Sequence, residues 1–344
     1  MNICVLGAGW FGCFIAHELI KKNHSVDIYE KEKDIFLNAS GNNQNRLHLG
    51  FHYPRSSITR RLSKAGFKVF KNKLKNFSKK IDNNFYAISN TLSSKMNFKK
   101  YLSVMLSSNL IFKKIDIKTL PFLKNLEGIV KSNEELILVE KVKKYYKKKL
   151  KKNLFLNHRV NLVKHQKNKY IINKKKYDLV INCTSLQFLR KKIKNLIYEY
   201  CTILLYKSVQ KSHPAITIMD GPFFTLYPWN NKNTFGLYSV VRSRLLVNKN
   251  LVSLKRKVKK VINKKYMFNV KNRIESEYST FYPLFKKKFR FIKFLNSYRT
   301  IIYNKFDSRS CKVTMEKNFI NVFPGKIDHI FYALEQIEKC LKKF

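Results

Sequence analysis

The sequence predicts an α/β fold, mixed α+β over the whole chain, and three observations support it. Residues 1–31 read as an apolar strand, a glycine turn, a helix and a second strand, which is a βαβ unit. Hydrophobic residues make up 44% of the 344 residues, enough for a large core. Residues 198–245 alternate as strands do, with turn signals at Asp220-Gly221-Pro222 and Asn230-Asn231, so a second, antiparallel sheet is expected there.

The glycine turn has the spacing G-x-G-x-x-G after the first strand. In this motif the first glycine permits a tight turn, the second lets the backbone approach a pyrophosphate, and the third lets the helix pack on the sheet. Free N–H groups at the start of the helix then face the phosphate charge. We expect the dinucleotide contacts of this turn at Gly7, Ala8, Gly9, Trp10, Phe11 and Gly12.

An acidic residue closes the unit. Glu30 ends the second strand, 18 residues after Gly12, where a carboxylate can accept hydrogen bonds from a ribose, and Lys31 follows it. A glycine turn in an ordinary βαβ unit is the alternative, and the strand–turn–helix context favours dinucleotide binding.

The net charge of +50 suggests a polyanionic partner at first sight. Of the 71 basic residues, however, only 13 are Arg, and the lysine runs extend along most of the chain together with Asn and Ile. Such a pattern is typical of A+T-rich codons, whereas a nucleic-acid site would more often concentrate Arg beside aromatic residues. We therefore expect no specific nucleic-acid partner, only salt-sensitive binding to polyanions.

The six cysteines are scattered without a C-x-x-C pair, so we expect no metal site and a reducing compartment, the cytoplasm. The apolar N-terminal stretch is broken by three glycines, unlike a signal peptide, and no run reaches the length of a transmembrane helix. Peripheral membrane contact stays open.

The remaining elements follow in order. A loop is expected at 38–55, helices at 56–78 and 139–152, strands at 154–156 and 178–184, a basic amphipathic helix at 250–275, a strand at 318–323, a turn at 324–326 and a last helix at 327–342. This order predicts a discontinuous cofactor domain (1–80, 136–195 and 300–344) into which a substrate domain (81–135 and 196–299) is inserted twice.

Four segments resemble the D-amino-acid oxidase-like FAD-dependent oxidoreductases. Segment 39–56 has a serine-containing turn and then Leu-His-x-Gly, as in the family's second flavin-contacting segment. Arg159-Val160 resembles the strand that meets the adenine, 178–184 the strand that closes the cofactor domain, and 323–327 the turn under the flavin ring. The chain departs from the family at Thr184-Ser185, at Pro324-Gly325 and at Arg46.

The resemblance implies an FAD-binding Rossmann-like domain with an inserted antiparallel-sheet substrate domain. It implies hydride transfer from a small amine or hydroxy compound to flavin, with oxygen, a quinone or a carrier protein as the electron acceptor. Further cofactor contacts are implied at Ser40, Asn45, Arg46, Leu47, Val160, Thr184, Gly325, Lys326 and Ile327.

Two residues are predicted to be catalytic. His48 could orient flavin or substrate or act as a base, the alternative being a structural histidine. Arg46 could clamp a carboxylate or phosphate, or it could pair with a nearby acid. The other predicted substrate contacts are His52, Tyr227 and Arg299. Tyr227, as an aromatic residue in a strand-rich region, could equally belong to the core.

Three other functions stay open. An NAD(P)-dependent dehydrogenase would share the N-terminal unit but would need neither segment 39–56 nor the Gly325-Lys326 turn. A basic nucleotide- or RNA-binding module on a flavoprotein scaffold would use the positive charge. A non-redox flavoenzyme, such as a sugar-nucleotide mutase, would keep the flavin and lose the oxidation.

Overall fold

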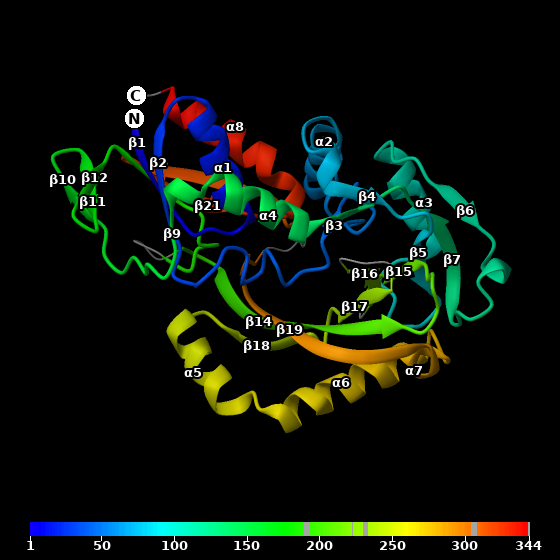
Figure 1. The fold of residues 1–344 in the computed structure, drawn as a ribbon. Coiled ribbons are helices and arrows are strands. Elements are labelled where there is room, and N and C mark those ends of the chain that lie inside the picture. The colour runs from blue at the N-terminus through cyan, green and yellow to red at the C-terminus, as the bar shows by residue number, and fades with distance from the viewer. Residues whose placement is uncertain (189–192, 222, 230–232, 304–307, 343–344) are drawn as a thin grey trace.

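The computed structural model describes residues 1–188, 193–221, 223–229, 233–303 and 308–342. Its two large sheets lie on either side of the loop that follows the first βαβ unit (Figure 1). Pro222 and Asn230-Asn231, where turns were predicted, fall outside the described residues. Among the described residues, no helix is both long and apolar enough to cross a membrane.

The first sheet carries the N-terminal βαβ unit. Its six strands run in the order β20 (Lys312–Glu316), β21 (Phe319–Phe323), β13 (Leu179–Asn182), β1 (Asn2–Leu6), β2 (Ser25–Tyr29) and β9 (Leu154–Phe155). All neighbours are parallel except β20 and β21. Ile3 of the central strand faces Leu179 on one side and Val26 on the other. The two ends of the chain therefore meet in one sheet.

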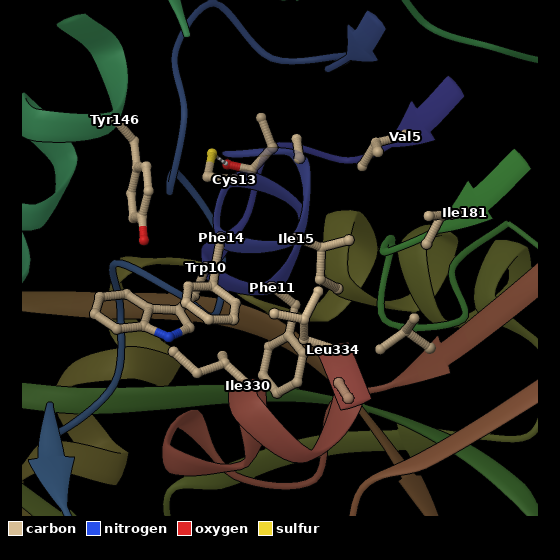
Figure 2. Packing of buried hydrophobic residues seen from close by; sticks show 14 of the residues in the cluster. Val5, Trp10, Phe11, Cys13, Phe14, Ile15, Tyr146, Ile181, Ile330 and Leu334 are labelled. Carbon is tan, nitrogen blue, oxygen red and sulfur yellow. Dashed lines mark hydrogen bonds between the residues drawn. The ribbon is translucent and has the colours of Figure 1, made fainter. Parts of the chain in front are cut away.

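Strand β1 buries both faces because its side chains alternate between two layers. Ile3 and Val5 point to the helices α1 (Trp10–Lys21), α4 (Val139–Lys149) and α8 (Ile330–Leu341). Cys4 and Leu6 point to the three-stranded sheet of β10 (Lys164–Gln166), β11 (Lys169–Ile172) and β12 (Lys175–Tyr177). Figure 2 shows the helix side, where α1 packs its aromatic side chains against α8.

The second sheet has nine strands among the described residues. Eight run in the order β18 (Arg244–Asn248), β14 (Leu196–Ser208), β17 (Thr234–Ser239), β16 (Phe224–Pro228), β15 (Ala215–Met219), β5 (Asn84–Ser89), β7 (Leu126–Lys131) and β6 (Lys113–Ile115), while β19 (Phe289–Ile302) pairs along β14. All pairs are antiparallel except β5 with β15. The strands come from two stretches of chain, and the predicted domain boundaries stay a prediction.

Alternation also gives this sheet two buried faces. Phe85 and Ala87 of β5 point to the side covered by α6 (Lys264–Ser279) and α7 (Phe285–Lys288). Tyr86 and Ile88 point to the side covered by α3 (Phe98–Ser107). The basic helix predicted at 250–275 is two helices, α5 (Leu251–Val261) and α6, because the Asn263 side chain caps α6 by accepting from the Tyr266 N–H at 2.9 Å.

Short elements connect the two sheets. Strands β3 (Arg46–Leu47), β8 (Glu135–Ile137) and β4 (Ser78–Lys80) form a small antiparallel sheet beside α2 (Ser57–Lys73). Single 3₁₀ turns occur at Lys75–Phe77, Ile117–Thr119, Lys151–Asn153 and Ile327–His329. The last helix therefore begins later than predicted, after the 3₁₀ turn at Ile327–His329. Val160, for which the resemblance implied a strand, lies in a loop.

Candidate cofactor pocket and active site

A cavity of about 280 Å³ opens where β1, β2 and β13 end. Its walls include the glycine turn and the residues that directly follow these strands. The predicted cofactor contacts that line it are Gly7, Gly9, Glu30, Lys31, Ser40, Val160 and Thr184. In parallel α/β sheets, ligands bind at this carboxyl edge, so the cavity is the candidate cofactor pocket.

The glycine turn leaves room that any other residue would fill. A Cβ on Gly9 would lie 2.9 Å from the Ser40 Oγ at the cavity wall, and one on Gly12 only 1.9 Å from the Gly7 carbonyl oxygen. Gly7 itself has φ +94°, a conformation that side chains rarely adopt. The Trp10 N–H at the start of α1 donates to Ser40 Oγ at 2.8 Å, which sets a hydroxyl beside the helix start. This cradle fits a pyrophosphate.

Glu30 is fixed at the end of β2 by backbone donors. One carboxylate oxygen accepts from the Ala8 N–H at 2.8 Å, and the other accepts from the Glu32 N–H at 3.0 Å. Each oxygen keeps a further lone pair. The carboxylate that lines the cavity can therefore also accept hydrogen bonds from ribose hydroxyls.

Several predicted cofactor contacts lie elsewhere. The side chains of Trp10 and Phe11 belong to the helix-side core (Figure 2), so only their backbone belongs to the glycine turn. Ala8 and Gly12 are packed inside the unit, and Asn45, Arg46, Leu47, Gly325, Lys326 and Ile327 are not part of the cavity wall. Other wall residues were not predicted, because no motif in the sequence marks them, among them Phe36, Asn38, Lys255 and Tyr298.

A second site is a group of buried and half-buried polar side chains that we call the histidine cluster: His48, His52, Tyr53, Glu134, Lys326 and Asp328. The ring centroids of His48 and His52 lie 5.7 Å apart, and each lies within 6 Å of the Tyr53 ring. The Lys326 Nζ lies 4.7 Å from the centroid of that ring. The predicted residues His48, His52 and Lys326 are thus brought together.

This cluster and its surroundings contain buried polar atoms without hydrogen bonds. Within the described ranges, His52 Nδ1 and Tyr53 Oη have no hydrogen-bond partner, and neither has the side-chain amide of the fully buried Asn45. Buried polar groups are normally paired, so such atoms indicate a place where a ligand would supply the partners. Asn45, which is a predicted cofactor contact, is one of these residues.

Glu134, in the loop before β8, organises the cluster, although nothing in the sequence marked it. Its carboxylate accepts from the Tyr86 hydroxyl at 2.6 Å and from the Leu49 N–H at 2.8 Å, and it lies 3.8 Å from His48 Nδ1. Burial alone would raise the pKa of Glu134, but His48, Arg46 and Tyr86 outweigh it and hold that pKa at about 2. Glu134 is therefore a buried negative charge behind His48.

Arg46 has internal partners. Its guanidinium donates to the Tyr86 hydroxyl and, at 2.8 Å, to Thr217 Oγ1, and it lies 3.5 Å from Glu134. It also stacks 4.0 Å from the centroid of the Tyr227 ring. The residue is only 2% exposed. The ion pair with a nearby acid, which the sequence left open as the alternative to a substrate clamp, is thus present in the structure.

The other two predicted substrate contacts are engaged with protein groups. Tyr227 is fully buried, and its hydroxyl donates to the Glu135 carbonyl oxygen at 3.1 Å. Arg299 donates to Glu199 at 2.6 Å and stacks on Tyr238. The side chains of both residues are thus bound by other protein groups of the structure.

Burial sets the protonation of the cluster. It lowers the pKa of His52 well below the ordinary range, and the charge of Arg46 adds to the effect. It also lowers the pKa of His48, where Glu134 opposes the shift. Burial and the charge of Arg309 lower the pKa of Lys326 to about 7. The cluster thus combines neutral imidazoles with a lysine that can exchange its proton near neutral pH. Among the described residues, no group of three acidic, His or Cys side chains could hold a metal ion.

The chain is similar to known FAD-dependent proteins. The family model described as FAD dependent oxidoreductase matches residues 2–84. The chain is 31% identical over 98% of its length to the FAD-dependent monooxygenase FPY4 of Fusarium mangiferae, covering 90% of that protein. It is 25% identical, again over 98% of its length, to the FAD-dependent monooxygenase kojA of Aspergillus flavus, of which it covers 85%.

Solved structures share the fold at low sequence identity. The FAD-bound L-alpha-glycerophosphate oxidase of Mycoplasma pneumoniae superposes with a TM-score of 0.75 at 14% identity, covering 99% of this chain and 94% of that one. The glycine oxidase of Geobacillus kaustophilus superposes with a TM-score of 0.73 at 10% identity, with the same two coverages.

Proposed function

The chain belongs to the family of FAD-dependent oxidoreductases, and from this premise we propose that it oxidises a small amine or hydroxy compound at the carbon that bears the nitrogen or oxygen. The cofactor is FAD, so the nicotinamide alternative receives no support. Neither the RNA-binding module nor the mutase is favoured by any of the relatives. The single observation that carries the proposal is the buried histidine cluster, with polar atoms left for a ligand.

The cofactor pocket would hold the nucleotide half of FAD. Gly9 and Ser40 would accommodate the pyrophosphate, Glu30 the ribose hydroxyls, and Val160 the adenine side. Asn45 and the Gly325-Lys326 turn would face the flavin end. When bound, FAD supplies the acceptor for the hydride of the substrate.

We propose that His48 accepts the proton of the substrate's amine or hydroxyl group. Its Nδ1 lies 3.8 Å from the Glu134 carboxylate and has no hydrogen-bond partner among the residues described here. A neutral imidazole backed by a buried carboxylate can take up a proton, because the negative charge of Glu134 stabilises the imidazolium that forms. His52, held neutral by its surroundings, would bind and orient the substrate.

Lys326 would supply positive charge at the turn that the family places under the flavin. With a pKa of about 7 it carries a proton in part of the molecules at neutral pH. A fixed cation stabilises negative charge that develops nearby during a reaction.

The names of two relatives suggest a second candidate, oxygen insertion. A monooxygenase would place one atom of O₂ in the product and the other in water, and a separate reductant would supply two electrons. The electron acceptor of the proposed oxidation would instead be oxygen, a quinone or a carrier protein. Since all six cysteines are free, we propose a reducing location, the cytoplasm.

The proposal can be tested with the purified protein, which should be yellow, since bound flavin absorbs near ~450 nm. Amines, hydroxy acids and sugar derivatives are then added anaerobically, and at least one class should bleach the flavin without a second reductant. A colourless protein that binds NAD would contradict the proposal. Bleaching only with an added reductant, followed by ¹⁸O from ¹⁸O₂ in the product, would establish the monooxygenase, and an isomerised product without bleaching would establish the mutase.

A further inference from the structure

Three basic side chains from distant parts of the chain line the cofactor pocket. Lys31 follows β2, Arg159 lies in the loop after β9, and Lys255 belongs to α5. The acidic residues of the wall are Glu30, whose oxygens accept from backbone N–H groups, and Glu32, which lies 3.5 Å from Lys31. Neither Arg159 nor Lys255 forms a salt bridge among the described residues, although both line the pocket.

Lys255 is held in place by the residue before it. Leu254 is fully buried in an apolar cluster with Leu186, after β13, and Phe323, at the end of β21. This cluster holds α5 against residues of both large sheets. In Figure 1, α5 lies near one end of β14. The lysine is therefore directed to the pocket by core packing and not by a flexible surface loop.

The surroundings of Lys255 are unfavourable for a cation. The side chain is partly buried, its Nζ lies 5.9 Å from the centroid of the Tyr298 ring, and no carboxylate of the described residues lies within salt-bridge distance. Burial, together with the charges of Lys31 and Arg159, lowers its pKa, and the charge of Glu32 only partly opposes that shift. Three like charges around one cavity repel each other, and an anion bound between them would remove that repulsion.

We propose that Lys255 is a cofactor-positioning residue which, together with Lys31 and Arg159, forms a cationic rim that holds the diphosphate-bearing half of FAD and couples its binding to the docking of α5. The inference rests on the proposed cofactor pocket. According to this proposal, α5 takes part in nucleotide binding, although it packs on the nine-stranded sheet. An anionic dinucleotide is favoured over a neutral nucleoside, because the rim recognises charge.

The chain offers a matched control. Lys257 lies on the same helix, two residues on, and is exposed outside the pocket wall. Lys255→Met and Lys257→Met make the same chemical change, while Lys255→Arg keeps the charge. The three full-length variants and the wild type are depleted of flavin and titrated with FAD, ADP and adenosine by calorimetry, and hydrogen exchange of the α5 amides is followed with and without ADP.

We expect K255M to bind FAD and ADP about tenfold more weakly, with adenosine affinity nearly unchanged, and K257M and K255R to bind as the wild type does. ADP should slow the exchange of the α5 amides in the wild type and not in K255M. Equal ADP affinity and equal protection of the α5 amides in K255M and K257M would contradict the proposed role of Lys255, but it would not contradict the proposed cofactor pocket. A wild type that binds neither FAD nor ADP would overturn the pocket itself, and the rim with it.

Discussion

The cofactor pocket and the histidine cluster differ in how the chain builds them. The glycine turn and Glu30 of the pocket come from one continuous stretch of 30 residues, and Glu30 is satisfied by backbone N–H groups. The cluster combines residues from the loop after β3 to the turn after β21, and it buries charges together with unpaired polar atoms. The glycine turn and Glu30 therefore rest on local backbone geometry, to which packing adds Arg159 and Lys255, whereas the proposed chemistry rests on long-range packing throughout.

The largest effect is expected from a side chain added to the glycine turn of the cofactor pocket, which should abolish binding without touching the histidine cluster. In Gly9→Ala the new Cβ would lie 2.9 Å from Ser40 Oγ, where the pyrophosphate is expected, so we expect flavin retention to be abolished. Gly236→Ala is the matched control, because its Cβ would lie at the same distance, 2.9 Å, from Ile203 Cγ2 in the large sheet. The absorbance of bound flavin after gel filtration measures retention. Flavin that stays bound to G9A would show that the pyrophosphate lies elsewhere.

Breaking the buried ion pair should affect stability more than substrate affinity. Arg46→Met leaves Glu134 without its buried cation, and we expect a loss of about 3–5 kcal/mol in the free energy of unfolding. Arg242→Met, which breaks an exposed pair with Glu277, should cost less than about 1 kcal/mol. Urea denaturation of both variants gives the values. A stable R46M protein with a raised substrate KM would instead support a substrate clamp.

Replacing the proposed base should slow the reaction and leave binding intact. We expect His48→Gln to retain FAD and to reduce it about a hundredfold more slowly, since a positioned base contributes at least that much. His213→Gln is a control in a buried histidine far from the cluster, stacked on Tyr282. Stopped-flow absorbance under anaerobic conditions gives the rate per bound flavin. An unchanged rate in H48Q would assign His48 a structural role.

The smallest effect concerns pH. The pKa of Lys326 falls from 10.5 to about 7 in the folded protein, so between these values the unfolded chain holds a proton that the folded chain has released. Stability should therefore rise with pH over that interval, and Lys326→Met should remove the rise. Lys260→Met, on the exposed side of α5, should keep it. Urea denaturation of the flavin-depleted protein at several pH values gives the free energy of unfolding as a function of pH. A wild-type value that does not change with pH would contradict the lowered pKa of Lys326.

The same difference explains what could be predicted from the sequence. Strand β1, helix α1 and strand β2 were predicted correctly, because periodicity and glycine spacing are local signals. Glu134 could not be predicted, since it lies in a loop and binds Tyr86, 48 residues away, through pairing that only the folded sheets create. Lys255 was missed for a similar reason: it looks like any lysine of a basic helix until Leu254 docks α5 beside the pocket.

The family resemblance extended the prediction beyond local signals. It indicated segment 39–56 and the 323–327 turn, which the structure brings together where His48 and Lys326 meet at the Tyr53 ring. It could not predict the partners of Arg46, because the family pattern has no arginine there and Thr217 comes from a different sheet.

The central claim is that the nucleotide binds in the cofactor pocket while the reacting end lies at the histidine cluster. A crystal structure of the protein with FAD bound tests it most directly. The account predicts the adenine ribose at Glu30, the pyrophosphate at Gly9 and Ser40, and the isoalloxazine in contact with Asn45 and the histidine cluster. A ring that lies away from His48, His52 and Lys326 would contradict the account.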